Sequence, residues 1–170
     1  MMKRFALFIV LILLVSKSFA QSVENDTLKL STHKKEISTF LKIIDTAGLN
    51  KLFTGQPVTI LAPDNKAFEN SPIPDSLFKP ANKALLLSLL NNHIIPGAFT
   101  VKDISALIHK GKGLVDFTAL SGKKYTAGIN ANRNIMLVDG SGAEHIIKVF
   151  DLHYGNAIIF IISSVISTKE

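Results

Sequence analysis

The stretch Thr59–Phe68, "TILAPDNKAF", determines how the rest of the chain is interpreted. Its first residues are β-branched or apolar, which predicts a buried strand. Pro63 has no backbone N–H to donate, so the strand must end there. Asp64 or Asn65 can then accept from the free amides of a helix that begins at Lys66. The stretch therefore predicts a strand-to-helix joint whose polar atoms are used locally, rather than a catalytic loop.

Helical periodicity lies on both sides of this joint. Apolar residues recur at helical spacing from Glu36 to Ala47, and Gly48 follows as a C-terminal stop. A second helix is expected to present Leu86, Leu89, Leu90 and His93 on one face, with Asn91 and Asn92 off that face and Pro96-Gly97 at its end. A short helix is expected over residues 103–108.

After Gly111 the chain has the patterns of strands. Besides the strand over residues 58–61, strands are expected over residues 114–119, 123–129, 135–138, 145–152 and 157–166. The last of these, "AIIFIISSVI", is apolar on both faces, so it must be central and covered. Helices first and strands afterwards predict a single α+β domain.

The N-terminus has the pattern of a secretory signal peptide. Lys3 and Arg4 precede the apolar run Phe5–Val15, and Ser18-Phe19-Ala20 is typical of a cleavage site after Ala20. An uncleaved anchor is the alternative. We expect a signal peptide over 1–20, a polar linker over 21–33 and one domain over 34–168. The linker holds a glycosylation sequon at Asn25, relevant only in a eukaryotic host.

Cysteine content and charge narrow the function classes. The sequence has no Cys, which excludes a lipoprotein anchor and any disulfide. Its 19 basic residues fall to 16 when Lys3, Arg4 and Lys17 leave with the signal, against 13 acidic ones. The remaining charge is spread along the chain without interleaved aromatic residues, so no nucleic-acid partner is expected. No membrane span is expected after cleavage.

Catalytic and metal-binding patterns are not found in the sequence. Ser141 lies between glycines, but strand-like runs flank it, which indicates a hairpin turn rather than a nucleophile elbow. His93 shares a face with leucines, so we expect a buried imidazole that bonds a backbone carbonyl. The His and carboxylate spacings suit no metal. We expect no enzyme activity, metal or cofactor; a hydrolase is the least favoured alternative.

Three motifs carry a resemblance to a known family. "TILAPDNKAF", "LLNNHIIPGAF" and "DLHYGNAIIFIISSVI" resemble, in order, the signature motifs of a fasciclin-type domain, and the resemblance runs from about residue 35 to 168. This sequence has Asn92 where many members have Tyr, and Phe160 and Ser163 where the second signature has His and Asp. The family-signature positions to which the resemblance assigns a structural role are Thr59, Ala62, Pro63, Asp64 (where the family has Thr), Asn65, Phe68, His93, Pro96, Gly97 and Asn156.

The resemblance implies a β-wedge or sandwich flanked by helices and a non-enzymatic adhesion or protein-interaction role. The expected protein is secreted or periplasmic and binds an extracellular or envelope protein or glycan. By analogy with adhesive members, the binding positions are Asp151, Leu152, His93, Ile94 and Ile95. The alternative is a carrier of a small lipophilic ligand, since some fasciclin-like proteins resemble pigment carriers and the last strand is unusually apolar.

Overall fold

The computed structural model describes residues 30–71 and 75–166. The expected signal peptide, its cleavage site and Asn25 lie outside the described residues. The helices are α2 (Ser38–Ala47), α3 (Asn65–Asn70), α4 (Lys83–Asn92) and α5 (Val101–Lys110), with short 3-10 helices η1 (Asn50–Phe53), η2 (Asp75–Phe78) and η3 (Pro80–Asn82). The strands are β1 (Val58–Pro63), β2 (Ile94–Pro96), β3 (Leu114–Thr118), β4 (Lys124–Ile129), β5 (Ile135–Val138), β6 (Glu144–Tyr154) and β7 (Ala157–Ile162).

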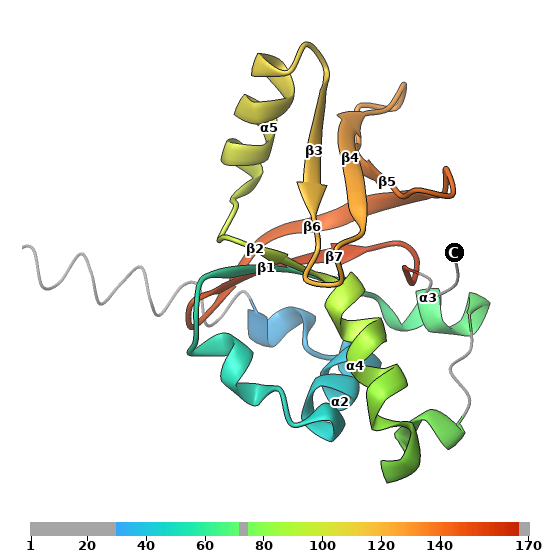
Figure 1. The fold of residues 1–170 in the computed structure, drawn as a ribbon. Helices are drawn as coiled ribbons and strands as arrows, with labels where there is room; N and C mark the ends of the chain where they lie inside the picture. Colours follow the sequence, from blue (N-terminus) through green and yellow to red (C-terminus); the bar gives the residue numbers. More distant parts are fainter. Residues whose placement is uncertain (1–29, 72–74, 167–170) are drawn as a thin grey trace, which may run out of the picture.

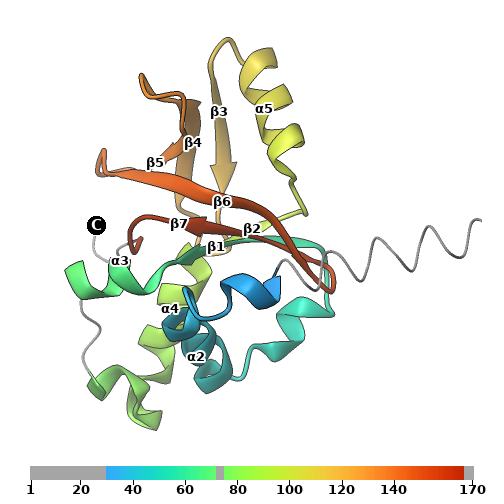
Figure 2. The same ribbon diagram turned by 180° about the vertical axis from the view of Figure 1, so that it is seen from behind.

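The strands form one strongly curved sheet in the order β2-β1-β7-β6-β5-β4-β3. β1 and β7 are parallel, and all other neighbours are antiparallel. Helices α2, α3 and α4 lie below the β1–β7 part of the sheet, and α5 lies beside β3 at the opposite end (Figure 1). The view from behind shows the same separation (Figure 2). The predicted α+β class is confirmed.

The central strand β7 explains how one domain holds two apolar clusters. All six of its residues are buried, as the sequence predicts for a central and covered strand. Ile159 and Ile161 point into the cluster formed with α2 and α4. Ile158, Phe160 and Ile162 point into the cluster formed with α5 and the β3–β5 strands. Because alternate residues of a strand face opposite sides, β7 belongs to both clusters and joins them.

The helices begin and end where local chemistry requires. Gly48 adopts a left-handed conformation (φ 73°) after α2, as expected of a C-terminal glycine. Thr100 and Asp103 form a reciprocal capping box, so α5 begins at Val101, two residues before the predicted start. Pro80 occupies the first turn that leads into α4.

Three sequence-based expectations about the fold are wrong. The polar linker does not extend to residue 33, because residues 30–33 are helical and Leu30 is 3% exposed within the core. Ile94–Pro96 forms strand β2 instead of ending a helix. Asn92, expected off the apolar face, is buried in the core, where its backbone carbonyl accepts a hydrogen bond from the Tyr125 hydroxyl.

Candidate functional site

The joint Thr59–Phe68 uses its polar atoms to hold elements together. Asp64 Oδ1 accepts from the Ala67 amide at 2.7 Å and so caps α3. Its other oxygen forms an ion pair with Lys148 on β6. Asn65 donates to the Lys35 carbonyl at 2.7 Å and accepts from the Thr39 amide at 3.1 Å, which fastens the start of α2. The predicted cap at Asp64 is confirmed, but the ion pair with Lys148 and the contacts of Asn65 join segments far apart in the sequence, so the use of these atoms is not only local.

Thr59 connects β1 to the segment that follows β2. Its hydroxyl donates to the Gly97 carbonyl at 2.7 Å and accepts from the Phe99 amide at 2.9 Å. Gly97 has a φ of 97°, and a Cβ there would lie 2.9 Å from the Phe99 ring. Pro96 ends the short pairing of β2 with β1. These signature residues therefore shape the turn that leads into α5.

His93 is fully buried and hydrogen-bonded through both ring nitrogens. Nδ1 donates to the Leu89 carbonyl at 2.8 Å, and Nε2 accepts from the Ile166 amide at 3.0 Å. Burial lowers the pKa of His93 from 6.5 to about 4, although the Leu89 carbonyl acts in the opposite direction. The expected buried imidazole is confirmed, and it connects α4 to the segment after β7.

Asn156 fastens the β6–β7 turn to η1. Its side-chain amide donates to the Gly55 carbonyl and its backbone amide donates to the Phe53 carbonyl, both at 2.8 Å. Gly155, with a φ of 58°, lies so close to η1 that a Cβ would be 1.9 Å from the Phe53 oxygen. The retained Asn of the second signature is therefore a structural residue here.

A Ser-His-Asp cluster exists that the sequence did not reveal. His145 Nδ1 lies 2.7 Å from Ser164 Oγ, and Nε2 lies 3.3 Å from Asp139 Oδ2. Since an ionised Asp139 only accepts, Nε2 carries the proton and Nδ1 accepts from the Ser164 hydroxyl. The three residues come from the β5–β6 turn, β6 and the segment after β7, so only the folded chain brings them together.

The cluster has the features of a structural clamp. The His145 side chain is only 3% exposed, which keeps a substrate away from the imidazole. Burial alone would raise the pKa of Asp139, but hydrogen bonds from Ser141, Ala143 and His145 outweigh it and lower the pKa to about 2. The carboxylate thus holds the "DGSG" turn, which joins β5 to β6 as the predicted hairpin.

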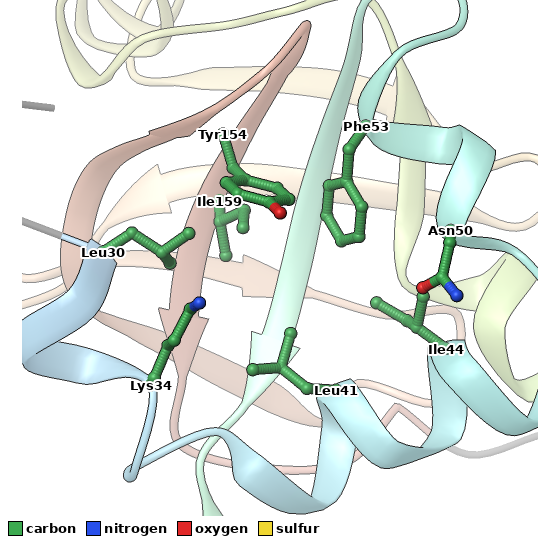
Figure 3. Close-up of a pocket in the computed structure, with 8 residues that line it drawn as sticks. All are labelled: Leu30, Lys34, Leu41, Ile44, Asn50, Phe53, Tyr154 and Ile159. Carbon is green, nitrogen blue, oxygen red and sulfur yellow. The ribbon is translucent and has the colours of Figure 1, made fainter. Parts of the chain in front are cut away.

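A half-open pocket lies between the N-terminal helices and the β6–β7 turn. Its volume is about 160 Å³. We call it the Tyr154 pocket; it is lined by Leu30, Lys34, Leu41, Ile44, Asn50, Phe53, Tyr154 and Ile159 (Figure 3). The Phe53 and Tyr154 rings meet edge to face at 4.7 Å between centroids. No sequence motif marks this pocket, because its walls come from four separate segments.

In the described part of the chain, no group of three or more His, Cys, Asp or Glu residues is placed to hold a metal ion. No helix within residues 30–71 and 75–166 is long and apolar enough to cross a membrane.

A family model described as "Fasciclin domain" matches residues 35–168, most of the chain. The chain belongs to the fasciclin family. Among solved structures, it is similar to a FAS1 domain pair from the insect cell adhesion molecule fasciclin I, with a TM-score of 0.62 and 23% identity. The alignment covers 79% of this chain and 46% of the insect chain, so the present protein spans less than half the length of that relative. No curated protein sequence matches the chain.

The fasciclin fold places most of the predicted adhesion residues inside the protein. His93, Ile94, Ile95 and Leu152 are each at most 4% exposed. Their side chains cannot reach a partner in this structure, so direct contact through these four is not supported. Asp151 is half-buried, has a φ of 54°, and accepts from the Val101 amide at 2.7 Å. Its carboxylate therefore accepts from the first amide of α5 and helps to hold the start of that helix.

Proposed function

We propose that this fasciclin protein is exported and acts outside the cytoplasm as a non-enzymatic module that binds another protein or a glycan. The observation that carries the proposal is the family match over residues 35–168, because fasciclin domains are adhesion and protein-interaction modules. The adhesion molecule named in the similar insect structure supports the same role. The signal-peptide pattern at residues 1–20 supports export.

The contact surface that fits this role is the outer face of β3–β6. On the inner face, Phe117 and Tyr125 are buried in the cluster that also contains Ile104 and Ile108 of α5. Cross-strand pairing places one apolar row on the outer face: Leu114, Gly128, Met136 and Ile146. Leu114 is 58% exposed. An apolar row on a solvent-facing sheet is the kind of feature that marks protein contacts.

A polar row runs beside the apolar one. It consists of Asp116, Thr126, Val138 and Glu144, which pair across the same strands; three of the four are polar, and the carboxylates lie on β3 and β6. Thr126 donates to Asp116 at 2.8 Å. Apolar surface next to polar and charged side chains is typical of protein–protein interfaces. We call the two rows together the outer sheet face.

The lipophilic-carrier alternative loses the basis it had in the sequence. Its argument was the apolar final strand with Phe160 in place of the usual His. β7 lies between β1 and β6, and Phe160 is fully buried against Phe150 in the core. The apolar residues of this strand therefore stabilise the domain, and the proposed function does not use them for a ligand.

Affinity capture tests the proposed function. The mature chain, immobilised through its C-terminus, is incubated with envelope and secreted fractions of the producing cells, and bound material is identified by mass spectrometry. We expect a protein or glycan whose capture saturates and is competed by free mature chain. A heat-unfolded sample is the control for non-specific adsorption. The absence of any saturable partner in both fractions would contradict the proposal.

Export has its own test. The full chain is expressed in its host, and the cytoplasmic, envelope and extracellular fractions are compared by intact mass. We expect the protein outside the cytoplasm with Gln21 as its first residue. A full-length protein that stays in the cytoplasm would contradict export, even if capture in vitro succeeded.

A further inference from the structure

The Tyr154 pocket has the size of a site for one aromatic ring. Its volume is about 160 Å³. An apolar protein cavity of about 150 Å³ is known to hold benzene. The pocket is therefore too small for a long-chain lipid or an extended pigment, but it accommodates a single ring with a short substituent.

The walls of the pocket are mostly apolar, and aromatic on one side. Leu41 and Ile44 of α2 face Ile159 of β7, while Phe53 and Tyr154 supply two rings (Figure 3). Edge-to-face contact between these rings leaves aromatic surface to which a third ring can add favourably. This composition favours an aromatic body over a sugar or another strongly polar group.

One cation stands beside these apolar walls. The Lys34 side chain extends into the pocket with its ammonium between Leu41 and Tyr154 (Figure 3), 6.0 Å from the centre of the Tyr154 ring. None of the lining residues is acidic. Within the described chain, no carboxylate lies within ion-pair distance of Lys34.

Two further polar groups line the pocket, the Tyr154 hydroxyl and the Asn50 side-chain amide (Figure 3). Asn50 donates its side-chain N–H to the Asp45 carboxylate at 2.9 Å, so this amide is partly engaged. Lys34 is therefore the charged side chain of the pocket lining. An ammonium that has no carboxylate partner among residues 30–71 and 75–166, at the side of an apolar pocket, complements a ligand with an apolar body and an anionic head.

We propose that the Tyr154 pocket binds a small aromatic carboxylate, with its ring between Phe53, Tyr154 and Ile159 and its carboxylate on Lys34. The site is separate from the outer sheet face, so the proposed partner binding does not depend on it. A benzoate-type carboxylate is ionised at neutral pH, so its contact with the Lys34 side chain is charge-assisted.

Two-dimensional amide NMR with benzoate as the probe tests the proposal. We expect saturable shifts of the Lys34, Phe53 and Tyr154 amides, with a dissociation constant on the order of 1 mM for a ligand of this size. Benzyl alcohol, which keeps the ring without the charge, should bind more weakly. Lys34→Met keeps the apolar stem of the side chain. It should lower the affinity for benzoate by about threefold to tenfold and leave the affinity for benzyl alcohol unchanged.

Lys35→Met is the matched control, since it removes the adjacent charge from an exposed position outside the pocket. It should bind benzoate like the unmodified protein. Leu41→Phe fills the pocket and should reduce the binding of both probes. The proposal would be overturned by benzoate shifts that fall elsewhere, by equal losses in Lys34→Met and Lys35→Met, or by no binding. Such a result would leave the capture experiment unaffected.

Discussion

Nε2 of His93 accepts a hydrogen bond from the backbone amide of Ile166 at 3.0 Å, across 73 residues of sequence. Through this bond the end of α4 holds the chain segment after β7. Only a neutral imidazole can make it, because the bond needs the lone pair of Nε2 while Nδ1 donates to Leu89.

Acid is expected to destabilise the protein through His93. The pKa of His93 is about 4 in the folded protein against 6.5 for the ordinary group, so the unfolded chain binds more protons between these pH values. Its stabilising contribution is present above pH 6.5 and is lost as the pH falls toward 4. The full loss is about 3 kcal/mol at 1.36 kcal/mol per pKa unit. Urea unfolding at several pH values measures it.

His93→Gln, which cannot titrate, should be less stable at neutral pH and should show a smaller fall in unfolding free energy between pH 6.5 and 4. His109→Gln is the control, because it makes the same substitution at an exposed imidazole outside the core. If His93→Gln and the unmodified protein have parallel profiles, the buried imidazole is not the acid-sensitive group.

Gly155 should tolerate alanine much less well than Gly122. Both glycines have positive φ, 58° and 85°, so alanine is strained at each, by about 1–2 kcal/mol. At Gly122 a Cβ would meet open space. At Gly155 it would lie 1.9 Å from the Phe53 carbonyl oxygen and push η1 away from the β6–β7 turn. We expect Gly155→Ala to cost about 2–4 kcal/mol in total.

Thermal and urea unfolding of the two variants provide the comparison. Gly122→Ala serves as the control for backbone strain alone. Equal destabilisation of both variants would show that the close approach between Gly155 and Phe53 does not constrain the fold.

Asp64 is expected to stabilise the fold mainly as a helix cap. Asp64→Ala removes the acceptor for the Ala67 amide and should cost about 0.5–2 kcal/mol of unfolding free energy. Asp64→Asn keeps an oxygen for the cap and removes only the negative charge that pairs with Lys148. The Lys148 side chain is 43% exposed. An ion pair this exposed contributes less than about 1 kcal/mol.

Lys148→Met breaks the same ion pair from the other side and should match Asp64→Asn in urea unfolding. If Asp64→Asn were as destabilising as Asp64→Ala, the ion pair would outweigh the cap.

The Ser164–His145–Asp139 cluster is expected to stabilise the fold and not to catalyse. Ser164→Ala should cost about 1 kcal/mol because it leaves a buried imidazole nitrogen without its donor. A fluorophosphonate probe, which labels activated serines, should not react with the native protein. Labelling of the native protein that disappears in Ser164→Ala would contradict this and reopen the hydrolase alternative.

The sequence predicts those parts of the structure that local chemistry determines. The cap at Asp64, the stop at Gly48, the central position of "AIIFII" and the buried His93 depend on residues close together in sequence or on a clear periodicity. Strand β2 was missed because three residues ending in Pro resemble a helix stop.

Features that depend on tertiary packing could not be predicted in this way. Leu30 lies in a polar stretch whose few apolar residues follow no helical or strand period, so periodicity could not indicate its burial. His145, Asp139 and Ser164 meet only because β5, β6 and the segment after β7 are neighbours in the sheet. The adhesion positions were assigned from the family's motifs. A motif does not show which of its side chains are exposed, so it could not predict that most of these are buried.

We propose that the family's signature residues build the fold while the outer sheet face makes the contact with the partner. Leu114 and Leu85 are almost equally exposed, at 58% and 57%, but Leu114 lies on the outer sheet face and Leu85 on α4. The most direct test is the affinity of the captured partner for Leu114→Asp and Leu85→Asp. We predict a loss of about tenfold or more for Leu114→Asp and little change for Leu85→Asp. Unchanged affinity in Leu114→Asp, or an equal loss in both variants, would contradict the claim.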